Sequence, residues 1–181
     1  MEVQYLNIHQ EIIDRCQAGD KKAYGELYQL YAKAMFNVCL RMTNNQQEAE
    51  DILQEAFVSA FKSLKNYRSK STFGAWLKRI VINKTLNHIK KRKLELFPLE
   101  DNIEKIENDT KQEDEASIFN IHKIKKAIAL LPDGYRTVFS LYAVEGYDHG
   151  EIAGIMNITE STSKSQYNRA KKKVRSLVEK L

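Results

Sequence analysis

A run of positive charge between Lys78 and Lys93 is the strongest chemical signal in the sequence. It contains seven Lys or Arg residues and no Asp or Glu. Solvated helices normally mix the two signs of charge, so a one-sided run favours a polyanionic partner such as nucleic acid. A basic face that only keeps the protein in solution is the alternative. The candidate DNA contacts on this face are Lys78, Arg79, Asn83 and Lys84.

A short polar loop, residues 66–72 with the sequence NYRSKST, precedes the basic run. Reading one unstacked base requires hydrogen-bonding groups for its Watson–Crick edge and a stacking or apolar wall, and a polar loop on a rigid support provides both. An ordinary connecting turn is the alternative, and the residues alone do not decide between the two. The candidate base-reading residues are Asn66, Tyr67, Arg68, Ser69, Lys70 and Ser71.

A second basic cluster lies near the C-terminus, where residues 169–175 carry five Lys or Arg and no acid. Polar side chains precede it at the spacing of one helical face. A recognition helix places its early residues at base edges and its later charges on phosphates, so this stretch is a candidate reader of duplex DNA. The candidate contacts are Ser161, Lys164, Ser165, Gln166, Asn168, Arg169 and Lys172.

Apolar residues at helical spacing predict the elements that position the first two groups. One helix covers residues 46–64, and the next begins at residue 73. The first is expected to bury Leu53, Ala56, Phe57, Ala60, Phe61 and Leu64, and the second Phe73, Trp76, Leu77, Ile80, Val81 and Leu86. The exposed half of the first helix includes Asp51, Gln54 and Glu55.

Two helices are predicted before these. Residues 11–18 form a short helix closed by Gly19, and Asp20 is the expected N-cap of a longer helix that runs to about Thr43. Asn44 and Asn45 then break the pattern. The longer helix has a broad aromatic face, which is more often core than a ligand site.

The C-terminal part has a pattern of short helices. From residue 117 a buried stripe is expected through Ile118, Ile121, Ile124, Ile128 and Leu131, and after Pro132 it continues through Tyr135, Val138, Phe139, Leu141 and Tyr142. Asp148 and Glu151 fit a capping box that opens a short helix, and Thr159 is the expected cap of the last helix. Two helices joined by a tight turn make a helix-turn-helix.

Composition predicts an all-α protein of two small helical domains joined by a flexible acidic linker. The chain has 181 residues, of which 43% are hydrophobic and 29% charged, and it shows no alternating strand pattern. Residues 1–97 and 118–181 are each basic, whereas residues 98–117 hold eight acids and two bases. No stretch approaches the roughly 20 apolar residues of a membrane span. Since no secretion signal is recognisable either, a cytoplasmic location is expected.

The sequence offers no pattern of an enzyme or a metal site. Cys16 and Cys39 are too few and too far apart for a ligand pair and are expected to be reduced core thiols. The four His residues lack metal-binding spacing. Because no Gly-rich phosphate loop, nucleophile–base arrangement or carboxylate cluster is found, we expect no catalysis, no cofactor, no metal and no small-molecule substrate.

The string DILQEAF, the polar loop and FGAWLKRIVINKTLNHIKK together resemble region 2 of an extracytoplasmic-function sigma factor. The stretch GELYQLYAKAMFNVCLRMT resembles the first helix of that region, and the chain from LPDGYRTVFSLY onward resembles region 4. Such proteins are transcription initiation factors that bind bacterial core RNA polymerase and direct it to promoters. The resemblance therefore implies core RNA polymerase and promoter DNA as partners, and usually an anti-sigma factor at the membrane.

The resemblance also implies roles for the candidate residues. Asp51, Gln54 and Glu55 match the motif that docks on the polymerase, although acids near a helix N-terminus are also favoured by the helix dipole. The loop and the basic helix then read the −10 element, and the C-terminal helix-turn-helix reads the −35 element. The linker, fully extended at roughly 3.3 Å per residue, can reach about 60 Å, which is close to the distance along the DNA between the −10 and −35 elements.

Four positions depart from the family pattern. Asn87 stands where Asp is usual, and Lys90 where Arg is usual, which weakens any base contact from Lys90. Ser163 replaces the usual Val and is expected to pack less well. Gln166 replaces the usual Arg, which would shift a base preference toward adenine. A helix-turn-helix regulator that acts without polymerase is the alternative function, but it leaves DILQEAF unexplained.

Overall fold

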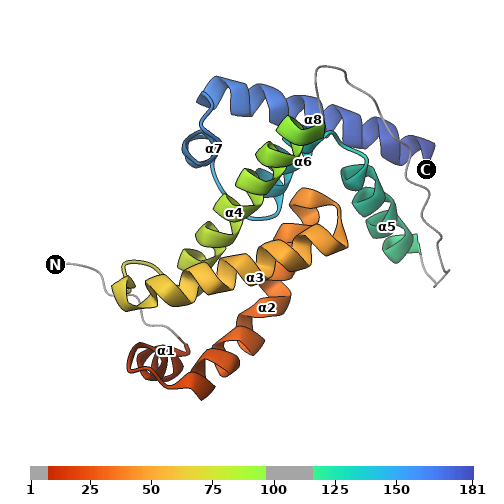
Figure 1. Ribbon diagram of the computed structural model, residues 1–181. Helices are drawn as coiled ribbons and strands as arrows, with labels where there is room; N and C mark the ends of the chain where they lie inside the picture. The colour runs from red at the N-terminus through yellow and green to blue at the C-terminus, as the bar shows by residue number, and fades with distance from the viewer. Residues whose placement is uncertain (1–7, 97–115) are drawn as a thin grey trace. The chain divides into compact units, whose positions relative to one another are not determined.

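The computed structural model describes residues 8–96 and 116–181, with side chains over 8–92 and 121–181 (Figure 1). Every regular element in this part of the chain is a helix, so the predicted all-α fold class is confirmed. The elements are α1 (Gln10–Gln17), α2 (Lys21–Thr43), α3 (Gln46–Ser63), the 3-10 turn η1 (Leu64–Asn66), α4 (Phe73–Leu96), α5 (Ala116–Ala129), α6 (Asp133–Ala143), α7 (His149–Met156) and α8 (Glu160–Lys180). No helix in the described ranges is long and apolar enough to cross a membrane.

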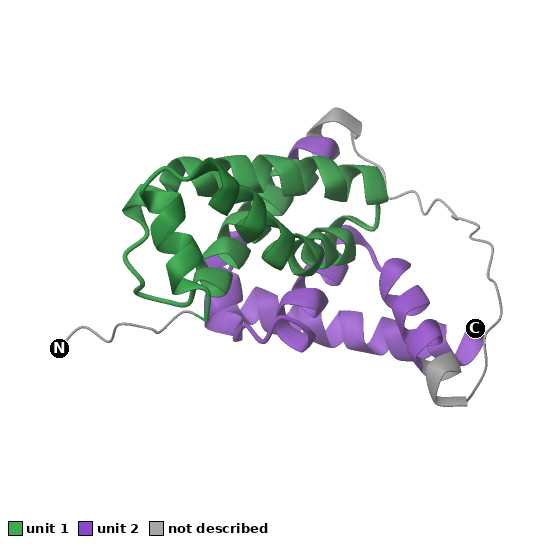
Figure 2. Ribbon diagram, turned by 90° about the horizontal axis from the view of Figure 1, so that it is seen from below, with its two compact units in different colours: residues 1–89 green, residues 90–181 purple. Residues whose placement is uncertain are grey.

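The chain divides into two compact units, residues 1–89 and residues 90–181, and the division falls within α4 (Figure 2). The predicted linker at residues 98–117 lies, apart from its last two residues, outside the described part. The predicted domain limits at residues 97 and 118 therefore stay predictions.

Side-chain caps start the helices where the sequence predicts. Asp20 accepts a hydrogen bond from the Lys22 amide at 2.9 Å. Asn44, at φ 54°, ends α2 in the left-handed region, which Asn tolerates better than most residues. Asn45 is then the N-cap of α3 and accepts from the Glu48 amide at 3.0 Å. Each cap satisfies a backbone donor that the helix itself leaves unpaired.

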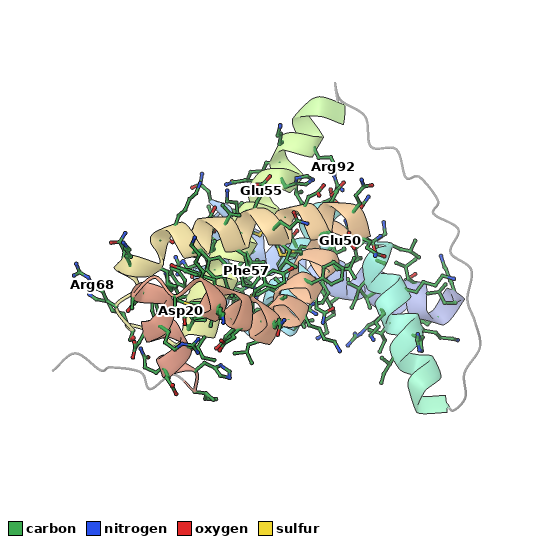
Figure 3. The ribbon with its side chains drawn as sticks, turned by 60° about the horizontal axis from the view of Figure 1, so that its bottom comes forward. Asp20, Glu50, Glu55, Phe57, Arg68 and Arg92 are labelled. Carbon is green, nitrogen blue, oxygen red and sulfur yellow. The ribbon has the colours of Figure 1, made fainter. Side chains whose placement is uncertain are left out.

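The core of the first unit lies where α2, α3 and α4 meet. α2 and α3 pack side by side, and Phe57 of α3 lies between them, 4.7 Å from Tyr28 between ring centroids (Figure 3). The core residues from α4 are Phe73, Leu77, Val81, Ile82, Leu86 and Ile89. Thr85 is also buried, and its hydroxyl donates a hydrogen bond to Cys39 Sγ of α2 at 3.7 Å. This packing fixes which face of α4 points away from the core.

The core of the second unit forms around α8, which packs against α5, α6 and α7. Ala127 and Leu131 meet Ala170 and Val174 there, and the partly buried members are Ile128, Tyr135, Phe139, Leu177 and Val178. Leu141 and Val138 of α6 are fully buried.

Three residues expected in this second core are exposed. Ile121 is 52% exposed, Ile124 42% and Tyr142 39%. From the predicted stripe, the described core contains Ile128 and Leu131, at its C-terminal end, and Ala127 joins them. The predicted helical spacing is therefore correct. Ile121 and Ile124 remain exposed because no described element of this unit packs over the turn that carries them.

Candidate nucleic-acid interface

The basic face of α4 is fixed by the buried residues on its other side. Leu77, Val81 and Ile82 are fully buried, so the predicted contact residues turn outward. Arg79 and Asn83 are exposed, and Lys78 and Lys84 are partly exposed. Further exposed positions of this face are Asn87, Lys90 and Lys91. A helix with this arrangement presents a row of positive charge suited to a phosphate backbone.

The loop before α4 places only part of its predicted residues at the surface. Asn66, Arg68 and Lys70 are exposed, and Figure 3 shows Arg68 projecting away from the ribbon. Ser71 is partly exposed. These side chains supply amide, guanidinium, ammonium and hydroxyl groups, which are the kinds that hydrogen-bond base edges and phosphates.

Tyr67 and Ser69 were expected to face a base and instead lie inside the loop. Tyr67 is 7% exposed, packs against Phe73 and Trp76, and donates its hydroxyl proton to the Ser71 carbonyl at 2.7 Å. Ser69 is 8% exposed and has a φ of 52°. Tyr67 is held inside by its ring contacts and its hydrogen bond, and Ser69 lies at a turn with a left-handed backbone, so both shape the loop.

Trp76 is an aromatic residue that remains partly exposed beside the loop. Its ring lies 5.1 Å from Tyr67 and 5.5 Å from Phe73 between centroids. Periodicity assigned Trp76 to the core together with Phe73, because both share one helical face. The sequence signal that could distinguish the buried Phe73 from the partly exposed Trp76 is position along the helix, since Trp76 lies one turn further from its start. Trp76 is thus a candidate stacking surface that the sequence analysis missed.

The acidic face of α3 points away from its core. Asp51, Gln54 and Glu55 are exposed, with Val58 on the same side, whereas Ile52 and Ala56 are buried. The Glu55 carboxylate lies 3.8 Å from Lys84 Nζ of α4. The first unit therefore carries an acidic face and a basic face on adjacent helices, and the polar loop joins these two helices.

The second unit contains the predicted helix-turn-helix, formed by α7 and α8. Asp148 and Glu151 make the expected capping box at the start of α7, with hydrogen bonds of 2.8 and 2.9 Å. Asn157 turns the chain at φ 56°, and Thr159 accepts from the Thr162 amide at 3.0 Å to start α8. The predicted caps and turn are confirmed, and they set the direction of the recognition helix.

The outward face of α8 holds most of the predicted contact residues. The exposed ones are Ser161, Lys164, Ser165, Asn168, Arg169 and Lys172. Lys164 Nζ forms an ion pair with Glu160 Oε1 at 2.6 Å, and this carboxylate raises the pKa of Lys164. Lys164 thus remains charged but is held by its own helix.

Gln166 does not share this orientation. Its Oε1 is buried and has no hydrogen-bond partner among the described residues. That oxygen lies 3.8 Å from the position that a Cβ on Gly134 would occupy, so the amide points toward α6. Gln166 therefore does not present its amide oxygen to DNA in this geometry, which does not support the expected contact with adenine.

Ser163 has a partner that the sequence analysis did not identify. Its side chain is fully buried, and its Oγ lies 2.9 Å from His149 Nδ1 at the start of α7. His149 also stacks on Tyr142 at 4.3 Å between centroids. The expectation of poorer packing than Val overlooked this hydrogen bond, which ties the two helices of the helix-turn-helix together.

Comparison with known proteins agrees with the two units. Residues 27–95 match the family model of sigma-70 region 2, and residues 121–174 match that of sigma-70 region 4. The RNA polymerase sigma-H factor of Pseudomonas aeruginosa is 30% identical over 181 residues, covering 91% of each chain. The chain belongs to the sigma-70 family. The ECF RNA polymerase sigma factor SigW of Bacillus subtilis is also 30% identical, over 90% of this chain and 92% of the relative, which places this sigma factor in the extracytoplasmic-function class.

Solved structures share the fold of this sigma factor. The sigma factor RpoE of Bartonella quintana, in complex with the anti-sigma factor NepR, is 22% identical with a TM-score of 0.62, covering 87% of this chain and 98% of that one. CnrH, in complex with the cytosolic domain of CnrY, is 19% identical with a TM-score of 0.55, covering 94% and 96%. The chain is a transcription initiation factor, and the alternative of a helix-turn-helix regulator acting without polymerase is not favoured.

Proposed function

We propose that this sigma factor binds core RNA polymerase through the exposed face of α3 and directs it to promoters with two DNA-reading surfaces. The observation that carries the proposal is the arrangement in the first unit, where Glu55 of the acidic face and Lys84 of the basic face lie 3.8 Å apart. Polymerase and DNA would then be bound side by side, so that docking brings the polymerase to the DNA that the loop and α4 contact.

The polymerase contact is assigned to Asp51, Gln54 and Glu55. All three are exposed, and Val58 adds an apolar surface that is 52% exposed on the same side. An exposed apolar residue rimmed by charged ones is typical of a protein interface. A basic surface on the polymerase would complement this face.

The −10 element is assigned to the loop and to α4. The exposed Asn66, Arg68 and Lys70, together with Ser71, would read an unstacked base of the melted strand, with Trp76 as the stacking wall. Tyr67 and Ser69 would act by holding the loop in shape. The phosphates of the same strand would lie along Lys78, Arg79, Asn83 and Lys84.

The −35 element is assigned to α8. Ser161, Lys164, Ser165 and Asn168 lie in its first turns and would contact base edges in the major groove. Arg169 and Lys172 would contact phosphates. Gln166 is left out of the base contacts because its amide oxygen is buried.

Partners beyond the promoter follow from the family. Two solved relatives are bound to an anti-sigma factor or to the cytosolic domain of a second protein, and we propose a partner of this kind for this chain. Binding polymerase and promoter places its action in the cytoplasm. No catalytic step, cofactor or small-molecule substrate is assigned to it, since the polymerase supplies the chemistry. The acidic segment 98–117 would set the reach between the two DNA-reading units.

Reconstitution with core polymerase tests the proposal. The expected result is run-off transcription from a subset of genomic promoters that core enzyme alone does not use. Replacing Asn66, Arg68, Lys70 and Ser71 with Gly and Ser, while the buried Tyr67 and Ser69 are kept, should block promoter opening but spare closed-complex formation. Promoter opening is read as permanganate reactivity of unpaired thymines. Wild-type reactivity in that variant would reduce the loop to a connector, and failure to bind core would remove the function as a whole.

A further inference from the structure

Gln17, the last residue of α1, reaches across the first unit to the start of the base-reading loop. Its side-chain nitrogen donates to the Leu64 carbonyl at 3.0 Å and to the Tyr67 carbonyl at 3.2 Å. A side-chain amide has two N–H groups, so a single side chain satisfies both carbonyls. These two carbonyls bracket the turn η1 at the end of α3, where the chain enters the loop.

The position of Gln17 is set by contacts that do not involve the loop. The preceding residue, Cys16, is fully buried, and its carbonyl accepts a hydrogen bond from the Tyr24 hydroxyl at 2.9 Å. Arg15 forms an ion pair with Asp20 at 2.6 Å, and Gly19, two residues after the helix, turns the chain at φ 93°. The side chain of Gln17 therefore extends from a fixed backbone, and it can act as an anchor for the loop.

The hydrogen bonds from Gln17 also constrain the exposed side chains of the loop. Tyr67, whose carbonyl Gln17 holds, is followed directly by the exposed Arg68. Its own hydroxyl bonds the Ser71 carbonyl at 2.7 Å, which closes the loop over Ser69. A shift of the Tyr67 peptide would thus displace Arg68 and Lys70 together. Base reading depends on holding its donors to within a fraction of an ångström of their partners, so such a shift matters.

We propose that Gln17 is a positioning residue for base reading at the −10 element, a role that rests on the proposed function of the loop. It does not contact DNA. Its two hydrogen bonds fix the path of the backbone that presents Arg68 and Lys70, and so set how sharply the loop distinguishes one base from another. The alternative is that these bonds only stabilise the fold.

Two methionine variants separate the alternatives. Gln17→Met keeps the length of the side chain and removes both donors. Gln10→Met is the matched control, since Gln10 lies on the same helix and donates to Asp14 Oδ1 at 2.7 Å within that helix. Each variant is assembled into holoenzyme and tested on promoter fragments that carry each of the four bases at each −10 position. Open complexes are measured by permanganate reactivity.

The expected result for Gln17→Met is a loss of base discrimination of roughly tenfold at one −10 position, the scale of one weakened base contact. Affinity for core polymerase and preference at the −35 element should stay within twofold of wild type. The thermal unfolding midpoint should stay within several degrees of wild type. Gln10→Met should behave as wild type in every assay.

A third variant gives a signature that a purely structural role does not. Gln17→Glu places a carboxylate, which has no donor, against two carbonyl oxygens. Protonation restores one O–H donor, so base discrimination by this variant should improve as the pH is lowered. Wild type and Gln17→Met lack this group and should show no such improvement.

The outcomes are distinguishable from those of the proposed function. If the Gly/Ser loop loses promoter opening but Gln17→Met retains full discrimination, the loop function stands and the positioning role is wrong. The positioning role is also wrong if Gln17→Met lowers stability and core affinity without changing base preference. If the variant with the Gly/Ser loop opens promoters normally, the proposed function of the loop is wrong, whatever the result for Gln17→Met.

Discussion

Lys84 Nζ of α4 lies 3.8 Å from Glu55 Oε2 of α3, so the helix proposed to contact DNA and the helix proposed to contact polymerase meet in one ion pair. The side chain of Glu55 is 70% exposed and that of Lys84 37% exposed. Exposed pairs of this kind contribute at most about 1 kcal/mol to stability. Either side chain can therefore change partner when polymerase or DNA binds, at little cost to the fold.

This geometry gives a first prediction for the polymerase face. Asp51→Lys combined with Glu55→Lys should lower affinity for core polymerase by more than about a hundredfold, because a complementary charge becomes a repulsive one. Helix content should not change, since both residues lie on the exposed half of α3. A competition assay against a second sigma factor measures the affinity, and circular dichroism measures the helix content.

The matched control reverses two acids on a helix with no assigned interface. Glu11→Lys with Asp14→Lys on α1 changes the net charge by the same amount, and both residues are exposed. It should bind core polymerase as wild type does. Equal losses in both double variants would show a general effect of charge and would remove the docking role of α3.

The features that the sequence predicts well are those set by neighbouring residues. Asp20, Asp148 and Thr159 were assigned as caps, and each accepts the expected backbone amide hydrogen bond. Capping depends on residues within one turn, so a local pattern is enough to predict it. The outward face of α4 was also correctly placed, because Leu77 and Val81 define the opposite face by their spacing.

The features that the sequence misses depend on residues far along the chain. Ile121 and Ile124 follow a helical period, but their burial depends on whether another element covers that turn. The bond between Ser163 and His149 joins two helices, and neither residue type identifies its partner. Likewise, no local pattern connects Gln17 with the Tyr67 carbonyl, 50 residues further on. Such contacts follow from packing, which a linear pattern does not specify.

A second prediction concerns the buried aromatic of the loop. Tyr67→Phe removes the hydroxyl that donates to the Ser71 carbonyl and should lower the free energy of unfolding by about 1 kcal/mol. Tyr67→Ala also removes a ring packed on Phe73 and Trp76 and should cost about 3–5 kcal/mol. Urea unfolding measures both. Equal, small costs would mean that the ring is not part of the core.

A third prediction concerns the two helices of the helix-turn-helix. Ser163→Val restores the residue usual in the family but removes the partner of His149 Nδ1 and adds bulk at a fully buried position. We expect a loss of about 1–3 kcal/mol. In a double-mutant cycle with His149→Phe, the two changes should not add, because they remove the same bond. Strict additivity would show that the pair is not coupled.

A fourth prediction concerns Cys39. Burial raises the pKa of this thiol to about 11. The unfolded chain releases the same proton near the ordinary thiol pKa, so the stability that depends on the neutral thiol is full at low pH and falls as the pH rises through this window. Compared with Cys39→Ala, the wild type should therefore lose stability more steeply between about pH 9 and 11. If the urea midpoints of wild type and Cys39→Ala changed in parallel across this pH range, the prediction would be wrong.

The last prediction concerns how α8 reads the −35 element. Lys164→Ala should weaken binding and relax preference at one base position, at a cost of about 1–3 kcal/mol, because Lys164 lies at the groove end of the helix. Lys172→Ala should weaken binding almost equally on all sequences and reduce the slope of log K against log salt by about 0.9, as a lost phosphate contact does. A site library titrated at two salt concentrations with holoenzyme measures both effects.

The ion pair between Lys164 and Glu160, 2.6 Å long, adds a further test of this orientation. Lys164 must leave Glu160 to reach a base, so Glu160→Gln should strengthen binding while Lys164→Ala weakens it. Ser165→Ala and Asn168→Ala, on the same exposed face, should also relax base preference. Gln166→Met should leave base preference unchanged, because the amide oxygen that it removes is buried toward α6. If instead Gln166→Met relaxed the preference and Lys164→Ala did not, α8 would present a different face to DNA, rotated toward Gln166.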